Sequence, residues 1–178
     1  MIWESRYWKE ELLRQSKRLR TRCQQKRWTE ASSAKLELTL MNGFYAVRKL
    51  IESQKLSQSL MSKHFTVTEF PPSGKAANLL NWHHIDRLLR LDEPNKTSVD
   101  LLSLCNQFVH SYVFVRSLSD QNKLTGIFVA SDWKRRSCLY HIEIKQAVEL
   151  FEEVGRDHPT EAHFVWDKKK QDYRVTNN

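Results

Sequence analysis

The chain is poor in the residues that form turns and crosslinks. Its 178 residues include only four glycines, four prolines and three cysteines. So little glycine and proline argues against a low-complexity or loop-dominated protein. The odd number of cysteines and their wide separation (Cys23, Cys105 and Cys138) argue against a disulfide framework or a zinc knuckle. We therefore expect reduced thiols.

Long apolar runs and the common catalytic motifs are also missing. No stretch is apolar enough to cross a bilayer, and the charged start MIWESRYWKEELLRQ does not resemble a signal peptide. We therefore expect a cytoplasmic protein with no membrane partner. The sequence has no glycine-rich phosphate loop, no Gly-x-Ser-x-Gly and no His-Glu-x-x-His. His83 and His84 would point about 100° apart on a helix, so we predict no metal site and no cofactor.

Positive charge is abundant and unevenly distributed. The formal net charge is +8, and residues 1–30 hold nine lysines and arginines against four glutamates. Arg14, Arg18 and Arg22 would lie on the polar side of a predicted helix over residues 2–27. Such a basic face can attract RNA phosphates or an acidic protein partner. It can equally be an ordinary solvated face, and the sequence leaves both interpretations open.

The hydrophobic pattern predicts mostly helices, followed by strands. We expect helices over residues 29–54 and 78–91. Another helix should run to about residue 113, with Thr97 as its N-cap and Asp100 completing a capping box. Strands are expected over residues 64–70, 123–131 and 137–144, then a short helix and a hairpin over residues 162–176. The predicted fold is α+β and mostly α: an antiparallel helical bundle, then a small C-terminal antiparallel β-sheet with one short helix. The expected units are a basic N-terminal helix (1–30), the bundle (31–116) and a β-rich subdomain packed on it (117–178).

The stretch LCNQFVHSYVFV holds the candidate reactive residues. Asn106 and His110 are four residues apart and would share one face of a helix. Histidine can take the proton of a ribose 2′-hydroxyl near neutral pH, as metal-independent RNA cleavage requires. The developing charge also needs a cation, which Arg48 or Arg87 on another helix, or a second subunit, would have to supply. The alternative is that the pair is simply tied into the core.

A second basic segment is SDWKRRS, between two predicted strands. Arg135 and Arg136 follow Trp133 there, and basic residues beside an aromatic side chain suit single-stranded RNA. An ordinary solvated hairpin loop fits the same residues.

The segment LCNQFVHSYVF, following GFYAVRKLIES, resembles the HEPN superfamily over about residues 32–115. The resemblance implies a helical bundle, often dimeric, typical of metal-independent endoribonucleases in bacterial toxin–antitoxin and phage-defence systems. In the family motif, Arg-x(4–6)-His, the histidine matches His110 and the polar residue matches Asn106. The arginine would fall at Cys105, and the other permitted positions also lack it.

Three functions remain open on this basis. The resemblance implies an RNA-associated or partner-binding protein with a degenerate nuclease motif. Alternatively, it implies an active endoribonuclease that uses His110, Asn106 and an arginine from elsewhere, with Arg48 as our first choice. Without the resemblance, the chain could be a non-enzymatic adaptor that binds an acidic protein through its N-terminal helix. A homodimer is compatible with each.

Overall fold

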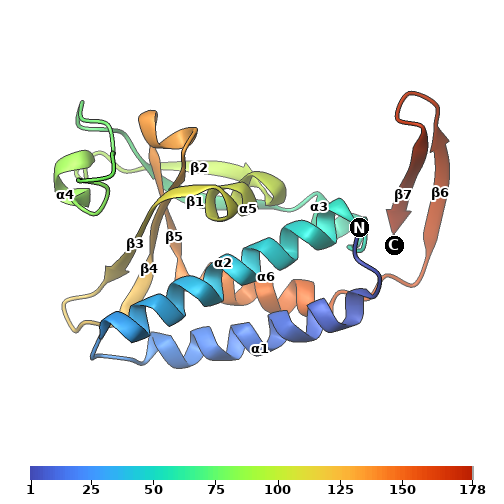
Figure 1. Cartoon of the computed structure of the whole chain (residues 1–178), viewed down its shortest axis with the longest axis horizontal. Coiled ribbons are helices and arrows are strands. Elements are labelled where there is room, and N and C mark those ends of the chain that lie inside the picture. The colour runs from blue at the N-terminus through green and yellow to red at the C-terminus, as the bar shows by residue number, and fades with distance from the viewer. Residues whose placement is uncertain (178) are drawn as a thin grey trace.

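The protein is built around a five-stranded antiparallel β-sheet. The computed structural model describes residues 1–177 (Figure 1). The sheet has the order β2-β1-β5-β4-β3, and β6 and β7 form a separate two-stranded sheet. The strands are β1 (His64–Phe70), β2 (Asn95–Asp100), β3 (Ser111–Leu118), β4 (Leu124–Ser131), β5 (Leu139–Glu143), β6 (Ala162–Asp167) and β7 (Asp172–Asn177).

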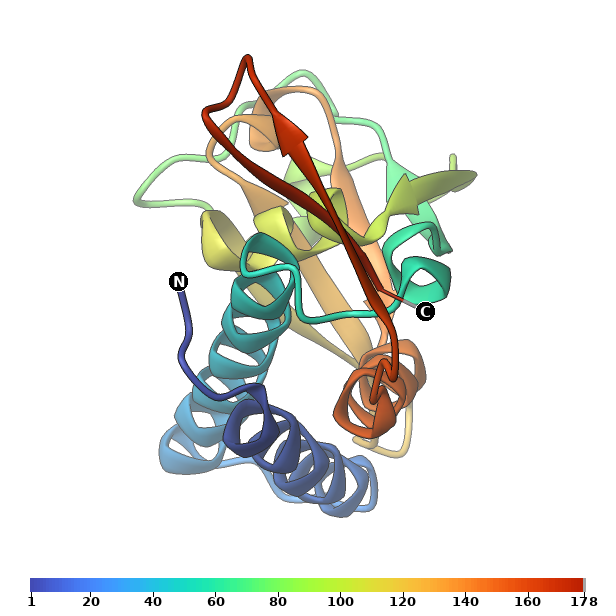
Figure 2. The ribbon, with the colours of Figure 1, turned by 90° about the vertical axis from the view of Figure 1, so that its right-hand side faces the viewer.

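Four longer helices accompany the sheet. They are α1 (Ser5–Cys23), α2 (Glu30–Glu52), α5 (Leu101–Val109) and α6 (Ile144–Arg156). Shorter turns of helix are α3 (Gln58–Met61), α4 (Ile85–Leu88) and the 3₁₀ turn η1 (Lys134–Arg136). In both views α1, α2 and α6 lie together on one side of the sheet (Figures 1 and 2). α1 packs against α6 and α2, and α2 packs against α5.

Alternating side chains give the sheet two buried faces. Ile127 and Val129 of β4 belong to the large core under the helices. Ala130, on the opposite face of the same strand, packs into a smaller core with Ile85 and Leu88 of α4. A strand buried on both faces reads as a nearly continuous apolar run. The strand predicted over residues 123–131 accordingly corresponds to β4.

The predicted helical bundle with a small C-terminal sheet is wrong. β1 and β2 lie within the segment assigned to the bundle, and they join β3, β4 and β5 in one sheet. The helix predicted from Thr97 begins only after Asp100, whose carboxylate accepts the backbone N–H of Ser103 at 2.7 Å. It ends at Val109, and the run from Tyr112 continues as β3 paired with β4. β-branched and aromatic residues favour a strand once a partner strand is available.

The helix predicted over residues 78–91 is reduced to the four residues of α4. Asn78 accepts the backbone N–H of Leu80 at 2.9 Å, and Asn81 accepts that of Asn78 at 2.7 Å. These local side-chain bonds offer the backbone an alternative to helical hydrogen bonds. The helix over residues 29–54, the strand over 64–70 and the hairpin over 162–176 were predicted in the right places.

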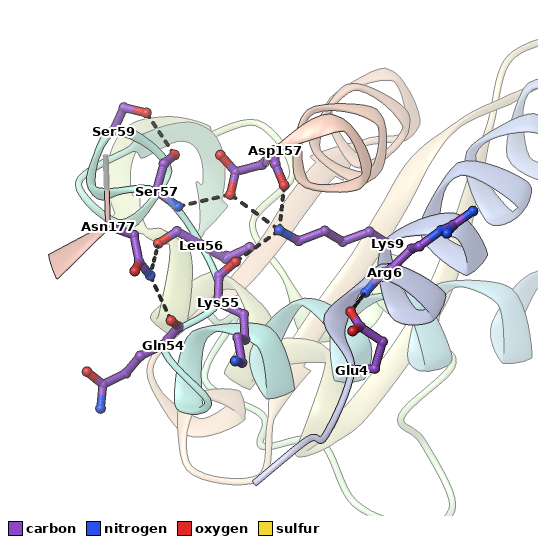
Figure 3. A network of polar contacts seen from close by, with 10 residues as sticks. All are labelled: Glu4, Arg6, Lys9, Gln54, Lys55, Leu56, Ser57, Ser59, Asp157 and Asn177. Carbon is purple, nitrogen blue, oxygen red and sulfur yellow. Dashed lines mark hydrogen bonds and ion pairs between the residues drawn. The ribbon is translucent and has the colours of Figure 1, made fainter. Parts of the chain in front are cut away.

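A buried lysine ties the start of α1 to the end of α6. Lys9 is 2% exposed, and its Nζ donates to the carbonyl oxygens of Lys55, at 3.0 Å, and Asp157 (Figure 3). The Asp157 carboxylate lies 3.9 Å from the same Nζ and accepts the Ser57 N–H at 2.9 Å. Residues far apart in the chain therefore meet in one polar cluster, which we call the Lys9 clasp.

Within residues 1–177, no helix has the length and apolar character needed to cross a membrane.

Candidate functional site

Arg48 and His110 come together where α2 passes α5. Phe44 of α2 stacks on Phe108 of α5 with ring centroids 3.7 Å apart. This packing fixes the two helices next to each other, and Arg48 Nη1 lies 2.6 Å from His110 Nε2. A guanidinium can only donate hydrogen bonds. His110 Nε2 is therefore the acceptor in this contact, and the proton of the neutral ring is on Nδ1.

The guanidinium is oriented from its other side by Glu52. Arg48 Nε donates to Glu52 Oε1 at 2.8 Å, and Lys49 Nζ donates to Glu52 Oε2 at 2.7 Å. Hydrogen bonds from Lys49 and Arg48 hold the pKa of the Glu52 carboxyl below its usual value. Arg87, the other arginine considered from the sequence, lies on α4 and is 3.9 Å from the Asp86 carboxylate. Of the two candidates, Arg48 is the one that contacts His110.

His110 is the residue directly after α5 rather than a residue within the helix. Its N–H donates to the Asn106 carbonyl oxygen at 3.1 Å, and its own carbonyl accepts the Asp132 N–H at 3.1 Å. The backbone of His110 is thus fixed both to α5 and to the turn after β4. Asn106 Oδ1 is buried and accepts no hydrogen bond from the described residues. A buried acceptor without a partner costs free energy. A ligand that donates a hydrogen bond to Asn106 Oδ1 would therefore bind more favourably.

Asn106 and His110 line one open cleft of about 700 Å³. The cleft also contains His64, the first residue of β1, and Lys134 and Tyr140 from η1 and β5. The β1–β2 pairing sets His64 opposite Asp100, at the start of α5. Its Nδ1 is 3.0 Å from the Ser62 carbonyl oxygen, which leaves Nε2 available. Sequence reasoning missed His64, because only strand pairing links it to His110.

The loop after β4 forms one wall of the cleft. Trp133 lines the cleft and is 92% exposed. Arg135, expected to bind RNA, makes contacts that hold the fold together. Its Nε donates to Asp132 at 2.7 Å, its guanidinium lies 3.8 Å from the centroid of the Tyr112 ring, and it also donates to the Ala77 carbonyl. Arg136 is exposed.

The N-terminal arginines lie away from this loop. α1 is at the bottom of Figure 1, whereas η1 is at the top. Arg14 and Arg18 both pair with Glu11, at 2.7 Å and 3.1 Å, and Arg22 donates to Gln25. The two groups of residues predicted to bind RNA therefore do not form one surface, and part of the charge on α1 is neutralised by the helix itself.

Cys105, at the position where the HEPN motif has its arginine, is fully buried. Burial raises the pKa of its thiol strongly, so Cys105 is not a nucleophile at neutral pH. In the described part of the chain, no group of three or more histidine, cysteine or acidic side chains is arranged to hold a metal ion.

Comparison of the chain with protein-family models, curated proteins and solved structures gives no match.

Proposed function

We propose that this protein cleaves single-stranded RNA in the cleft around His110, using side chains as acid, base and cation. The observation that carries the proposal is the contact between Arg48 and His110 at the edge of a cleft that holds a second histidine. A base, an acid and a cation are the groups that transphosphorylation of RNA requires.

The chemistry begins with release of the imidazole. A substrate phosphate offers oxygens that match the guanidinium of Arg48 better than His110 Nε2 does. When Arg48 Nη1 donates to a phosphate oxygen, Nε2 becomes free to accept the proton of the ribose 2′-hydroxyl. Glu52 keeps its hydrogen bond to Arg48 Nε, so the guanidinium moves only slightly between the two partners.

The bonds then change at phosphorus. The 2′-oxygen forms a bond to phosphorus while the bond to the 5′-oxygen breaks. His110 holds the proton from the 2′-hydroxyl, and protonated His64 gives its proton to the leaving 5′-oxygen. The products are a 2′,3′-cyclic phosphate and a 5′-hydroxyl. Arg48 stabilises the charge on the non-bridging oxygens of the transition state.

The test is cleavage of a labelled RNA oligonucleotide in EDTA by purified wild-type protein and by folded variants. We expect His110→Ala and Arg48→Ala each to lower the rate by about 100-fold or more. Arg87→Ala, which removes an exposed arginine that does not line the cleft, should retain the wild-type rate. Mass spectrometry should detect the 2′,3′-cyclic phosphate, and an all-deoxy oligonucleotide should remain intact. No cleavage by wild type, or equal cleavage by His110→Ala, would refute the proposal.

A further inference from the structure

The β6–β7 hairpin stands apart from the rest of the protein. Among the described strands, β6 and β7 pair only with each other. In Figure 1 the hairpin stands to the right of the molecule, and Figure 2 shows it in front when viewed from that side. Gln54 and Asn177 tether its base: Val175 N–H donates to Gln54 Oε1 at 2.7 Å, and Asn177 Nδ2 donates to the Gln54 carbonyl at 2.7 Å. An isolated two-stranded hairpin is only marginally stable in water.

One face of this hairpin is an exposed aromatic surface. Trp166 pairs with Tyr173, and Phe164 lies two residues before Trp166 on the same face. The three residues are 46%, 53% and 64% exposed. The Trp166 and Tyr173 rings meet edge to face, with centroids 5.0 Å apart and planes inclined by 69°. Both rings therefore keep π-surface available to a flat ligand.

The same face borders a groove. Phe164 and Tyr173 line it from the hairpin, and Met1, Gln54 and Lys55 line it from the body of the protein. Its volume is about 510 Å³, within the range of ligand-sized pockets. Along the hairpin the groove thus has two aromatic residues together with Asp172, and it has Lys55 on the opposite side.

Positive charge is concentrated at the tip of the hairpin. The turn contains three exposed lysines, Lys168, Lys169 and Lys170, and the described residues supply no acidic partner within 4.0 Å of any of them. Asp167 is engaged within the turn: it pairs with Arg174 at 2.9 Å and accepts backbone N–H groups. Exposed rings with free lysines beyond them match the bases and phosphates of a single strand.

We propose that the β6–β7 hairpin is a binding arm for single-stranded RNA. Unpaired bases stack on Phe164, Trp166 and Tyr173, and the lysines of the turn contact backbone phosphates. A second copy of the chain is a poorer occupant, because each copy carries a net charge of +8 and the tip is basic. The proposal rests on the proposed function for the choice of RNA, and it adds how the strand is held outside the cleft.

Binding is measured by fluorescence anisotropy with a labelled 12-nucleotide oligouridine in EDTA, in a His110→Ala background that prevents cleavage. Trp166→Ala/Tyr173→Ala should weaken binding roughly 10- to 100-fold. Val165→Ala is the matched control, because Val165 is 65% exposed on the opposite face of β6. It should leave binding unchanged. Replacing all three turn lysines by glutamine should reduce the slope of log K against log salt by about 2.

Two further readouts separate the arm from the cleft. Cleavage of the dinucleotide uridylyl-adenosine should be unchanged by the hairpin variants in an otherwise wild-type background, because so short a substrate occupies only the cleft. If cleavage is absent but the aromatic variant still loses binding, the proposed nuclease fails and the arm stands. Unchanged oligouridine binding by the aromatic variant overturns the arm. A wild-type dimer in sedimentation that this variant converts to monomer, with RNA binding retained, overturns it in favour of a second copy.

Discussion

Replacing Lys9 by methionine should destabilise the protein strongly, although the two side chains have similar volumes. The substitution removes a donor that serves the Lys55 and Asp157 carbonyl oxygens, and it leaves the Asp157 carboxylate without its ammonium neighbour. Removing one partner from a buried charged pair costs about 3 to 5 kcal/mol. Asp157 is still bonded to the Ser57 N–H, so we expect about 3 kcal/mol, near the lower end. For a chain of this size that corresponds to a fall in Tm of roughly 6 to 12 °C.

The assay is urea unfolding followed by circular dichroism, with Lys17→Met as the matched control. Lys17 is exposed on the same helix, and its substitution should change the free energy of unfolding by less than about 0.5 kcal/mol. If Lys9→Met were as stable as Lys17→Met, water or a rearranged loop would be satisfying the carbonyl groups. The structural importance assigned to the Lys9 clasp would then be incorrect.

Three further variants test packing, titration and stacking. Gly43→Ala should lower the free energy of unfolding by about 1 to 3 kcal/mol, because the added Cβ would lie 2.2 Å from Phe151 Cζ. This cost should exceed the gain from the better helix propensity of alanine. Unchanged urea unfolding would show that the Phe151 ring moves aside. Burial lowers the pKa of His141 below 6.5, so the unfolded chain binds the proton first and stability falls as the pH drops below about 6.5. His141→Gln should flatten that fall in unfolding curves between pH 7.5 and pH 5. Arg135→Lys should lower stability by about 1 to 2 kcal/mol through lost stacking and planar hydrogen bonds, whereas Arg136→Lys should match wild type in the same assay.

The sequence indicated residues that meet at the candidate site, although the fold predicted from it was wrong. Its spacing selected Asn106 and His110, and the chemistry of RNA cleavage demanded a cation from another helix. It preferred Arg48 to Arg87, but it could not show which of them contacts His110, because that contact depends on the stacking of Phe44 on Phe108.

The errors in the fold have a common physical origin. β3 and part of β2 are short segments whose local pattern is compatible with a helix, and only pairing with β4 and β1 decides their conformation. The pairing of β1 with β2, across residues 71–94, brings His64 to the cleft, so no local motif could have identified it. The β6–β7 hairpin was predictable because its two strands and its polar turn are contiguous in sequence.

The strand order β2-β1-β5-β4-β3 has a consequence for how the chain emerges from the ribosome. β3 and β4 form a local hairpin, β1 and β2 pair across residues 71–94, and β5 is the strand that joins the two pairs. Until residues 139–143 have been made, the nascent chain carries two separate strand pairs whose inner edges are unpaired. Such edges are templates for aggregation. A chain truncated just before β5 should therefore require chaperone protection. A chain that extends through β5 and α6 can close both the sheet and the helical layer.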